Sequence, residues 1–508
     1  MDLEKETAKK ENTVGLGWFI YSVLNKINTQ AIALVLLLIL SLQVFFGVLQ
    51  PANNTTDLVA LYYAKTSVIR VIGYIGIFLG TIEFYCKLYI HREKAMKWIF
   101  LKRMWVGLLT LLLIWSFFAI AIAEDRKLAF FGGAFRYEGF LSYLAYAGIF
   151  ICASLIKEEK YRKVLFYTIG VSSTLLAIIS FIKEKSGTTF LMSRNGQVGP
   201  YSATFINSNH YGYYICVCIA VIIGLYMMTD KIKGKVFWGI CFAVNTVILM
   251  YNRSLGPYLA VIICFILFLI FCWIRKGIKK TWPIFILVAL FILFSFVIND
   301  HQIINDLSLF GSQMGDATST IISGDTDSPE GQQILNGIGS SRGALWIKTF
   351  DVLIEHPMMG VGTDNIQLYI DNEIPHNEYL QIGANLGIPG LLMYLAALVS
   401  CAVFAFKNTK KLSEGAVIAF VSMIVYLVSA LVGISIPIAT YQLFFYFGLL
   451  NGWFKSRDDK AMVEIALGEL SKDSKSSKSI NENVDNNHEN IDSTSDIEKS
   501  EVTEEITQ

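Results

Sequence analysis

Long apolar runs separated by short polar connections cover most of the chain. A bilayer core about 30 Å thick takes about 20 residues of helix to cross. By this measure the sequence predicts an all-α, polytopic membrane protein. We predict twelve spanning helices, near residues 30–49, 66–90, 104–123, 139–156, 162–182, 209–229, 236–252, 257–274, 281–299, 386–406, 414–434 and 437–454. The first run lacks a small-x-small cleavage site and is too long for a signal-peptide core, so we expect it to stay as a span.

Basic residues gather in every second connection between the predicted spans. Cytoplasmic connections carry the excess of Lys and Arg in membrane proteins. The basic connections here include those after the sixth and eighth spans, with Lys231, Lys233, Lys235, Arg275, Lys276, Lys279 and Lys280. This alternation predicts that both termini are cytoplasmic.

Two segments depart from the spanning pattern. Residues 300–385 form one large excursion between the ninth and tenth spans, and the charge pattern predicts that it is extracytoplasmic. After Trp453 the chain is rich in Ser, Lys, Asp, Glu and Asn, a composition that cannot bury a core. We therefore expect five regions: a cytoplasmic N-terminus (1–29), spans one to nine (30–299), a catalytic loop (300–385), spans ten to twelve (386–455) and a disordered cytoplasmic tail (456–508).

The composition excludes a soluble globule of 508 residues. Apolar residues make up 54%, charged residues are 16% against roughly 25% in soluble domains, and the mean hydropathy is +0.51. The net charge of +1 gives no indication of a nucleic-acid partner. The 8 cysteines fall mostly inside apolar runs without a Cys-x-x-Cys pair, so they indicate neither disulfides nor a zinc site.

The excursion has a polar first part and an amphipathic second part. Residues 311–333 are rich in Gly, Ser, Thr and Asp, which is typical of a mobile loop. From Ser340 the spacing of the apolar residues predicts a helix that ends at His356-Pro357 and lies along the membrane interface. Its apolar face comprises Leu345, Trp346, Phe350, Leu353 and Ile354.

Several short motifs occur together in residues 341–395. They are Arg342, Trp346, a His-Pro-x-x-Gly-x-Gly turn that begins at His356, the pair His376-Asn377, and a Gly-Ile-Pro-Gly segment that begins at Gly387. Together they resemble the hallmark segment of the O-antigen ligase and polymerase superfamily of bacterial membrane proteins.

The resemblance upstream is looser. Asn207-Ser208-Asn209 is similar to an Asn-Pro-Asn motif of that family, with Ser208 in place of the proline. Arg253 stands just outside the seventh span, where the family commonly has Ser-Arg-Gly.

The resemblance implies a glycosyltransferase-C-like enzyme of the bacterial cytoplasmic membrane, with its site on the extracytoplasmic face. Such proteins move a glycan from an undecaprenyl-diphosphate carrier to a hydroxyl of a glycan, lipid or protein, in cell-surface polysaccharide biosynthesis, with no metal or cofactor. Besides donor and acceptor, we expect membrane lipids as partners and no nucleic acid. A ligase and a repeat-unit polymerase use the same donor, and both remain open. A transporter or flippase of lipid-linked sugars is the alternative from another class.

Arginine and histidine side chains fit the two needs of this reaction. A guanidinium forms paired hydrogen bonds to phosphate oxygens and keeps its charge, so Arg342 and Arg253 are candidates to hold the diphosphate. An imidazole with a pKa of about 6.5 accepts a proton near neutral pH. His376 is therefore either the base for the acceptor hydroxyl or, when protonated, a third cation for the diphosphate, and the sequence leaves both open.

Five further residues are candidates for substrate binding on the same face: Arg136, Arg194, His210, Asn377 and Glu378. Three of them also have a structural explanation. The alternative for the two arginines is a positive-charge anchor at the membrane surface or a surface ion pair. His210 stands where the sixth predicted span begins, so it also fits a polar helix start. Asn377 and Glu378 lie ahead of the tenth predicted span, beside His376.

Overall fold

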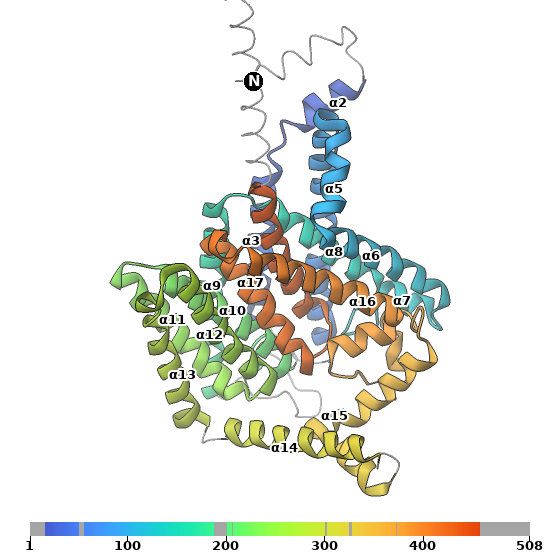
Figure 1. The fold of residues 1–508 in the computed structure, drawn as a ribbon, viewed down its shortest axis with the longest axis vertical. Helices are drawn as coiled ribbons and strands as arrows, with labels where there is room; N and C mark the ends of the chain where they lie inside the picture. The colour runs from blue at the N-terminus through green and yellow to red at the C-terminus, as the bar shows by residue number, and fades with distance from the viewer. Residues whose placement is uncertain are drawn as a thin grey trace, which may run out of the picture. The chain divides into compact units, whose positions relative to one another are not determined.

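The computed structural model describes residues 16–49, 55–186, 201–205, 207–299, 302–324, 328–371 and 373–457. These residues form helices and connections, and none of them forms a strand (Figure 1). The all-α prediction is therefore confirmed for the described chain.

The helices follow one another with short connections for most of the chain. In order they are α2 (Leu16–Leu24), α3 (Thr29–Leu42), α4 (Phe46–Leu49), α5 (Thr55–Lys102), α6 (Met104–Ile122), α7 (Arg126–Phe131), α8 (Phe140–Ser154), α9 (Glu159–Lys185), α10 (Ser208–Met228), α11 (Ile232–Asn252), α12 (Leu255–Lys276), α13 (Pro283–Asn299), α14 (Gln302–Ser323), α15 (Pro329–Glu355), α16 (Glu378–Lys407), α17 (Glu414–Ser429) and a last helix over residues 437–457.

Nine helices in the described part of the chain are long and apolar enough to cross a membrane. Two shorter apolar helices, Phe140–Ser154 and Pro283–Ile298, and the helix over 437–457 lie where the three other spans are predicted. An integral membrane protein is thus well supported. The count of twelve spans stays a prediction, as does the side on which each connection lies.

Helix α10 forms the centre of the spanning helices. Its side chains are buried almost without interruption from His210 to Met227, and it packs against α9, α11, α12 and α17. A helix that is apolar on all sides is stable only when other helices surround it. By contrast, α16 exposes Leu392 and Val399, as expected for a helix that faces lipid.

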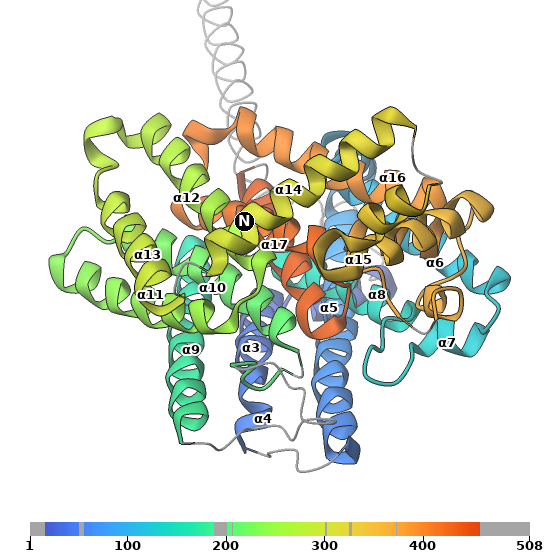
Figure 2. The ribbon, with the colours of Figure 1, turned by 90° about the horizontal axis from the view of Figure 1, so that it is seen from below.

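The prediction of a mobile loop over residues 311–333 is wrong, because α14 extends to Ser323 and α15 begins at Pro329. Phe310 and Ala317 lie on one face of α14, and they pack with Leu335, Ile338 and Trp346 of α15. The small polar residues between them conceal this helical period in the sequence. Helix α14 contacts the ends of α12 and α13, and Figures 1 and 2 show it crossing the end of the spanning helices.

Helix α15 begins earlier than predicted and is not straight. Ser328 caps it by accepting a hydrogen bond from the Gly331 N–H at 2.9 Å, so the predicted start at Ser340 is wrong. A Cβ on Gly343 would lie 1.8 Å from the Leu335 carbonyl oxygen. Eight residues of straight helix rise about 12 Å, so the chain must bend sharply between these residues. The predicted end of the helix, at His356-Pro357, agrees with the structure.

The predicted apolar face of this helix is only partly covered by protein. Leu353 is buried, whereas Phe350 and Ile354 are 52% and 61% exposed. These two exposed side chains are compatible with the predicted contact between this helix and the membrane interface, which stays a prediction.

Some predictions fall on residues outside the described ranges. They are Arg194, the first fifteen residues, and the tail from residue 458 onward. Residues 456 and 457 continue the last helix.

Candidate active site

The His-Pro-x-x-Gly-x-Gly turn packs against a break in α16. Gly387 interrupts this helix with a φ of 72°, a conformation that a residue with a side chain rarely adopts. Helix ends leave carbonyl groups without partners inside the helix. Turn and broken helix exchange three backbone hydrogen bonds of 2.8–2.9 Å: Ile388 N–H to Pro357 O, Val361 N–H to Ala384 O, and Gly362 N–H to Asn385 O.

The residues after this turn fasten a second loop, which carries Arg136. Thr363, Asp364 and Asn365 are all buried. The Asp364 Oδ2 accepts a hydrogen bond from the Gly133 N–H at 2.7 Å. The other two residues bind the chain around α7: Thr363 donates to Ala129 O at 2.6 Å, and Asn365 Oδ1 accepts from Asp125 N–H at 2.9 Å.

A spanning helix holds the same loop from the other side. The guanidinium of Arg70, on α5, donates to the carbonyls of Phe131 and Tyr137 at 2.7 and 2.9 Å. It also donates to Ser142 Oγ at 3.1 Å, and Ser142 in turn donates to the Tyr137 carbonyl. The loop over residues 132–139 is therefore fixed from α5, α8 and the segment after α15.

Arg136 is partly buried within this fixed loop. Burial lowers its pKa, and the nearby carboxylates of Asp364 and Glu373 oppose that effect. Burial likewise raises the pKa of Asp364 to about 6, against the effects of the Gly133 N–H and Arg136. The arginine therefore remains charged in a largely desolvated position.

A hydrogen bond of Trp346 holds the part of α15 that carries Arg342 next to the segment that carries His376. The Trp346 Nε1 donates to the Pro375 carbonyl at 2.7 Å, which joins α15 to the residue before His376. Residues four apart lie on the same face of a helix, so Arg342 is one turn from this contact. Burial lowers the Arg342 pKa, and Tyr213 on α10 opposes the shift.

His376 lies within electrostatic reach of both arginines. It is partly buried and has a φ of 50°. Burial, and then the positive charges of Arg342 and Arg136, lower its pKa to about 4. At neutral pH the imidazole is therefore uncharged and able to accept a proton.

Helix α10 supplies two more polar side chains to the same neighbourhood. His210, in its first turn, lies within electrostatic reach of His376, and Tyr213 lies within reach of Arg342. The His210 Nδ1 and the Tyr213 hydroxyl are buried and form no hydrogen bond to any described residue. The sequence did not single out Tyr213, because a tyrosine near the start of a span resembles an ordinary interface residue.

Asn377 and Glu378 are engaged in local contacts. The Asn377 side chain caps α16 by accepting from the Leu380 N–H at 3.0 Å. The buried Glu378 carboxylate accepts from the hydroxyls of Tyr394 and Tyr426, both at 2.8 Å. Both side chains therefore order the start of α16, and their predicted contact with substrate remains untested.

The Arg136 loop itself contains another buried carboxyl group, Glu138. It accepts hydrogen bonds from Tyr146 at 2.6 Å and from Ser435. Burial raises its pKa to about 8, while these two hydroxyls oppose the shift. The Thr440 hydroxyl lies 3.2 Å from that of Ser435 and 3.1 Å from that of Tyr426, so Glu138 and Glu378 belong to one polar network. The sequence signal was a lone acid beside Arg136 at the start of a predicted span.

Arg253 is not part of this group. It ends α11 with a φ of 57°, and its side chain is exposed. The cations that act on His376 are Arg342 and Arg136, and Arg253 is not among them. Its turn is held by Asn252, whose amide donates to the carbonyls of Tyr201 and Ser208 at 3.2 and 2.9 Å.

The arrangement provides two charged guanidinium groups and a neutral imidazole from three separate segments. Among the described residues, no group of three or more His, Cys, Asp and Glu side chains lies together as a metal site would require. The two guanidinium groups are suited to bind a phosphate-containing group, and the neutral imidazole is suited to remove a proton beside it.

Comparison with known families gives one match. Residues 239–395 match the model of a family described as O-antigen ligase. This range runs from within α11 to within α16, so it includes Arg253, Arg342 and His376. Arg136 and His210 lie outside it. No curated protein matches the chain.

Proposed function

We propose, from the match of residues 239–395 to the O-antigen ligase family, that the chain is a member of the O-antigen ligase and polymerase superfamily and transfers a glycan from an undecaprenyl-diphosphate carrier to an acceptor hydroxyl. The reaction would serve cell-surface polysaccharide biosynthesis on the extracytoplasmic face. One observation carries this proposal: Arg136, Arg342 and His376 converge from three segments, and both arginines act on the histidine.

In the proposed mechanism, Arg136 and Arg342 hold the diphosphate of the donor. Each guanidinium provides donors in a planar fork that matches two phosphate oxygens. As the sugar–oxygen bond breaks, negative charge grows on the departing diphosphate, and the fixed cations stabilise it. The partly buried positions of both arginines support this role, because a charge is felt more strongly where water is excluded.

His376 acts as the general base. The acceptor hydroxyl gives its proton to the imidazole, its oxygen forms the new bond to the sugar carbon, and the diphosphate leaves with the electron pair of the broken bond. A neutral imidazole at pH 7 favours this role over that of a third cation. Donor binding strengthens it, because the negative diphosphate offsets the two arginines and raises the His376 pKa toward its usual range.

The transport alternative receives no support from the charged residues inside the spans. Transporters place such residues around a substrate path near the midplane. Here Arg70 binds the carbonyls of Phe131 and Tyr137, and the buried Lys65 donates to the Thr204 carbonyl at 2.6 Å. Both cations therefore join segments of the protein.

The test is reconstitution of the full chain in vesicles with a lipid-diphosphate-linked glycan and candidate acceptors. A product ladder indicates a polymerase, whereas a single conjugate indicates a ligase. We expect His376→Ala and Arg342→Ala to lower turnover by about 10²–10⁴-fold, the usual contribution of such groups. His356→Ala serves as a control, because His356 is exposed at the end of α15.

Normal turnover in both variants, with the protein in the membrane, would exclude the proposed site. We propose that no metal takes part, so activity should persist in a chelator. Loss of activity that a divalent cation restores would contradict this part of the proposal.

A further inference from the structure

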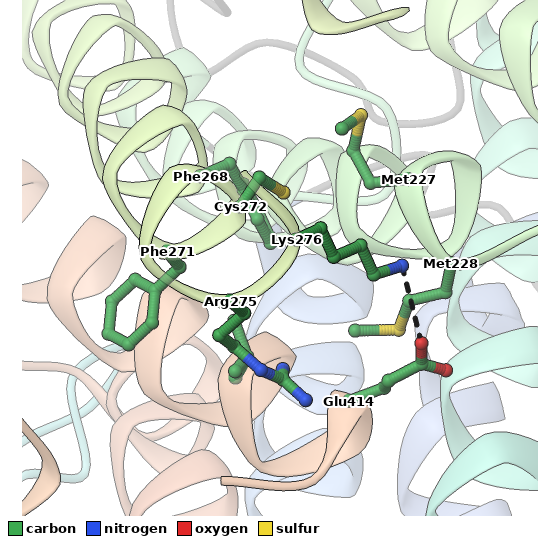
Figure 3. Close-up of a pocket in the computed structure, with 9 residues that line it drawn as sticks. Met227, Met228, Phe268, Phe271, Cys272, Arg275, Lys276 and Glu414 are labelled. Carbon is green, nitrogen blue, oxygen red and sulfur yellow. Dashed lines mark ion pairs between the residues drawn. The ribbon is translucent and has the colours of Figure 1, made fainter. Parts of the chain in front are cut away.

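A pocket lies at the opposite end of the central helices from the candidate active site. It is formed where α10 and α12 end and α17 begins, and it comprises about 320 Å³ of space outside the protein atoms, open solvent included (Figure 3). His210 is in the first turn of α10, whereas Met227 and Met228 are in its last turn. The pocket is therefore about 25 Å from the site along this helix.

The wall of the pocket is apolar. Met227 and Met228 of α10 and Phe268 and Phe271 of α12 line it. On the outer side of α12, Trp273 is 62% exposed, the position expected of an aromatic side chain at a membrane–water interface. The pocket therefore opens beside a surface that suits hydrocarbon chains.

Basic side chains surround the rim. Arg275 and Lys276, at the end of α12, extend toward Glu414 in Figure 3, and Lys276 pairs with Glu414 at 3.5 Å. Lys235 of α11 adds a third positive charge near the rim, since it lies within electrostatic reach of both Lys276 and Cys272.

Arg275 differs from its neighbours. It is partly buried, and it forms no hydrogen bond or ion pair with any residue that the structure describes. Glu414 is already paired with Lys276, and Lys163 lies 3.9 Å from it. The rim therefore presents an excess of positive charge to a ligand from outside the protein.

We propose that this pocket binds an anionic phospholipid, with the phosphate on Arg275 and Lys276 at the rim and the acyl chains along the exposed Trp273 beside it. The charge pattern of the connections predicts this end of the helices to be cytoplasmic, and anionic lipids attract basic residues at that surface. Basic pockets between spanning helices on that side are suited to lipid head groups. The exposed Trp273 beside the basic rim favours a lipid over free phosphate.

The experiment measures lipids retained by the purified full chain in native mass spectrometry. The probes are phosphatidylglycerol and phosphatidylcholine with identical acyl chains. We expect preferential retention of phosphatidylglycerol, and a loss of about fivefold in its apparent affinity for Arg275→Gln, since one basic residue near a membrane surface changes binding by roughly that factor. Arg275→Lys should retain most of the affinity.

The matched control removes two positive charges from the connection that follows α12, outside the pocket. Lys279 and Lys280 are exposed and lie outside the pocket. Lys279→Gln/Lys280→Gln should retain phosphatidylglycerol, whereas Arg275→Gln/Lys276→Gln should not. Equal losses in the two double variants, equal retention of both lipids, or displacement by millimolar inorganic phosphate would each overturn the proposal. Thermal unfolding of each variant identifies a loss caused by misfolding.

Discussion

Two connections each carry a candidate arginine, Arg136 between α7 and α8 and Arg253 between α11 and α12, and they are built very differently. The loop with Arg136 is held by Asp364 and by Arg70, from segments far away in the sequence. The turn with Arg253 is fastened by the neighbouring Asn252, and the arginine itself is exposed. We therefore expect that buried polar partners, rather than charge at a suitable place in the sequence, decide which arginine acts in the proposed site.

The strongest test of this difference removes each arginine in turn. We expect Arg136→Ala to lower kcat/KM about 100-fold, because a charged hydrogen bond contributes roughly 1.5–3 kcal/mol. Arg253→Ala should change it less than about threefold, as exposed charges usually contribute little. Both values come from the reconstituted transfer assay, and equal losses would remove the distinction between the turns.

A second test keeps the charge and alters its shape. Arg342→Lys should lower kcat/KM about 30-fold, since an ammonium group cannot form the paired hydrogen bonds of a guanidinium. The same change at Arg253 should have almost no effect. Full activity of Arg342→Lys would show that this residue supplies charge alone and does not grip the diphosphate.

The third test acts on Arg136 through its loop. Asp364→Ala removes the acceptor of the Gly133 N–H, and we expect about a tenfold rise in KM for the donor with a smaller change in kcat. Asp364→Asn should restore most of the affinity, because its amide oxygen accepts the same bond. Asp371, which is exposed, provides the control. A tenfold fall in kcat with an unchanged KM in Asp364→Ala would contradict a positioning role.

The smallest expected effect concerns the pH profile. Burial, and then the positive charges of Arg342 and Arg136, lower the His376 pKa to about 4, so protonation should reduce kcat/KM only in acid. Arg136→Gln removes one of these charges, so the pKa rises and the acid limb should move upward by about half a pH unit. The residual activity measured between pH 4 and pH 8 gives this shift. In Arg253→Gln the limb should stay in place, and a shift there would show that Arg253 also acts on the histidine.

The spans were the easiest part to predict from the sequence. Bilayer thickness sets the length of an apolar run directly, and every predicted range falls on a helix. Helix α14 was missed because glycine and serine between Phe310 and Ala317 hide its apolar face. Its stability comes from packing on α15, which a local pattern does not contain.

The site was predictable in its residue types and less so in its membership. Arg342 and His376 stand in a recognisable segment, whereas Asp364 and Gly133 meet across 231 residues of sequence. No local pattern announces such a contact. The neutral state of His376 depends on burial and on two arginines from other segments, so the sequence left its role open.

The break at Gly387 has a consequence for local unfolding of the protein. Because Val361 and Gly362 donate to carbonyls of α16, their amide protons are released to water only when that part of the helix itself yields. A connection of irregular backbone thereby shares the slow hydrogen exchange of a spanning helix, and the two behave as one cooperative unit during unfolding.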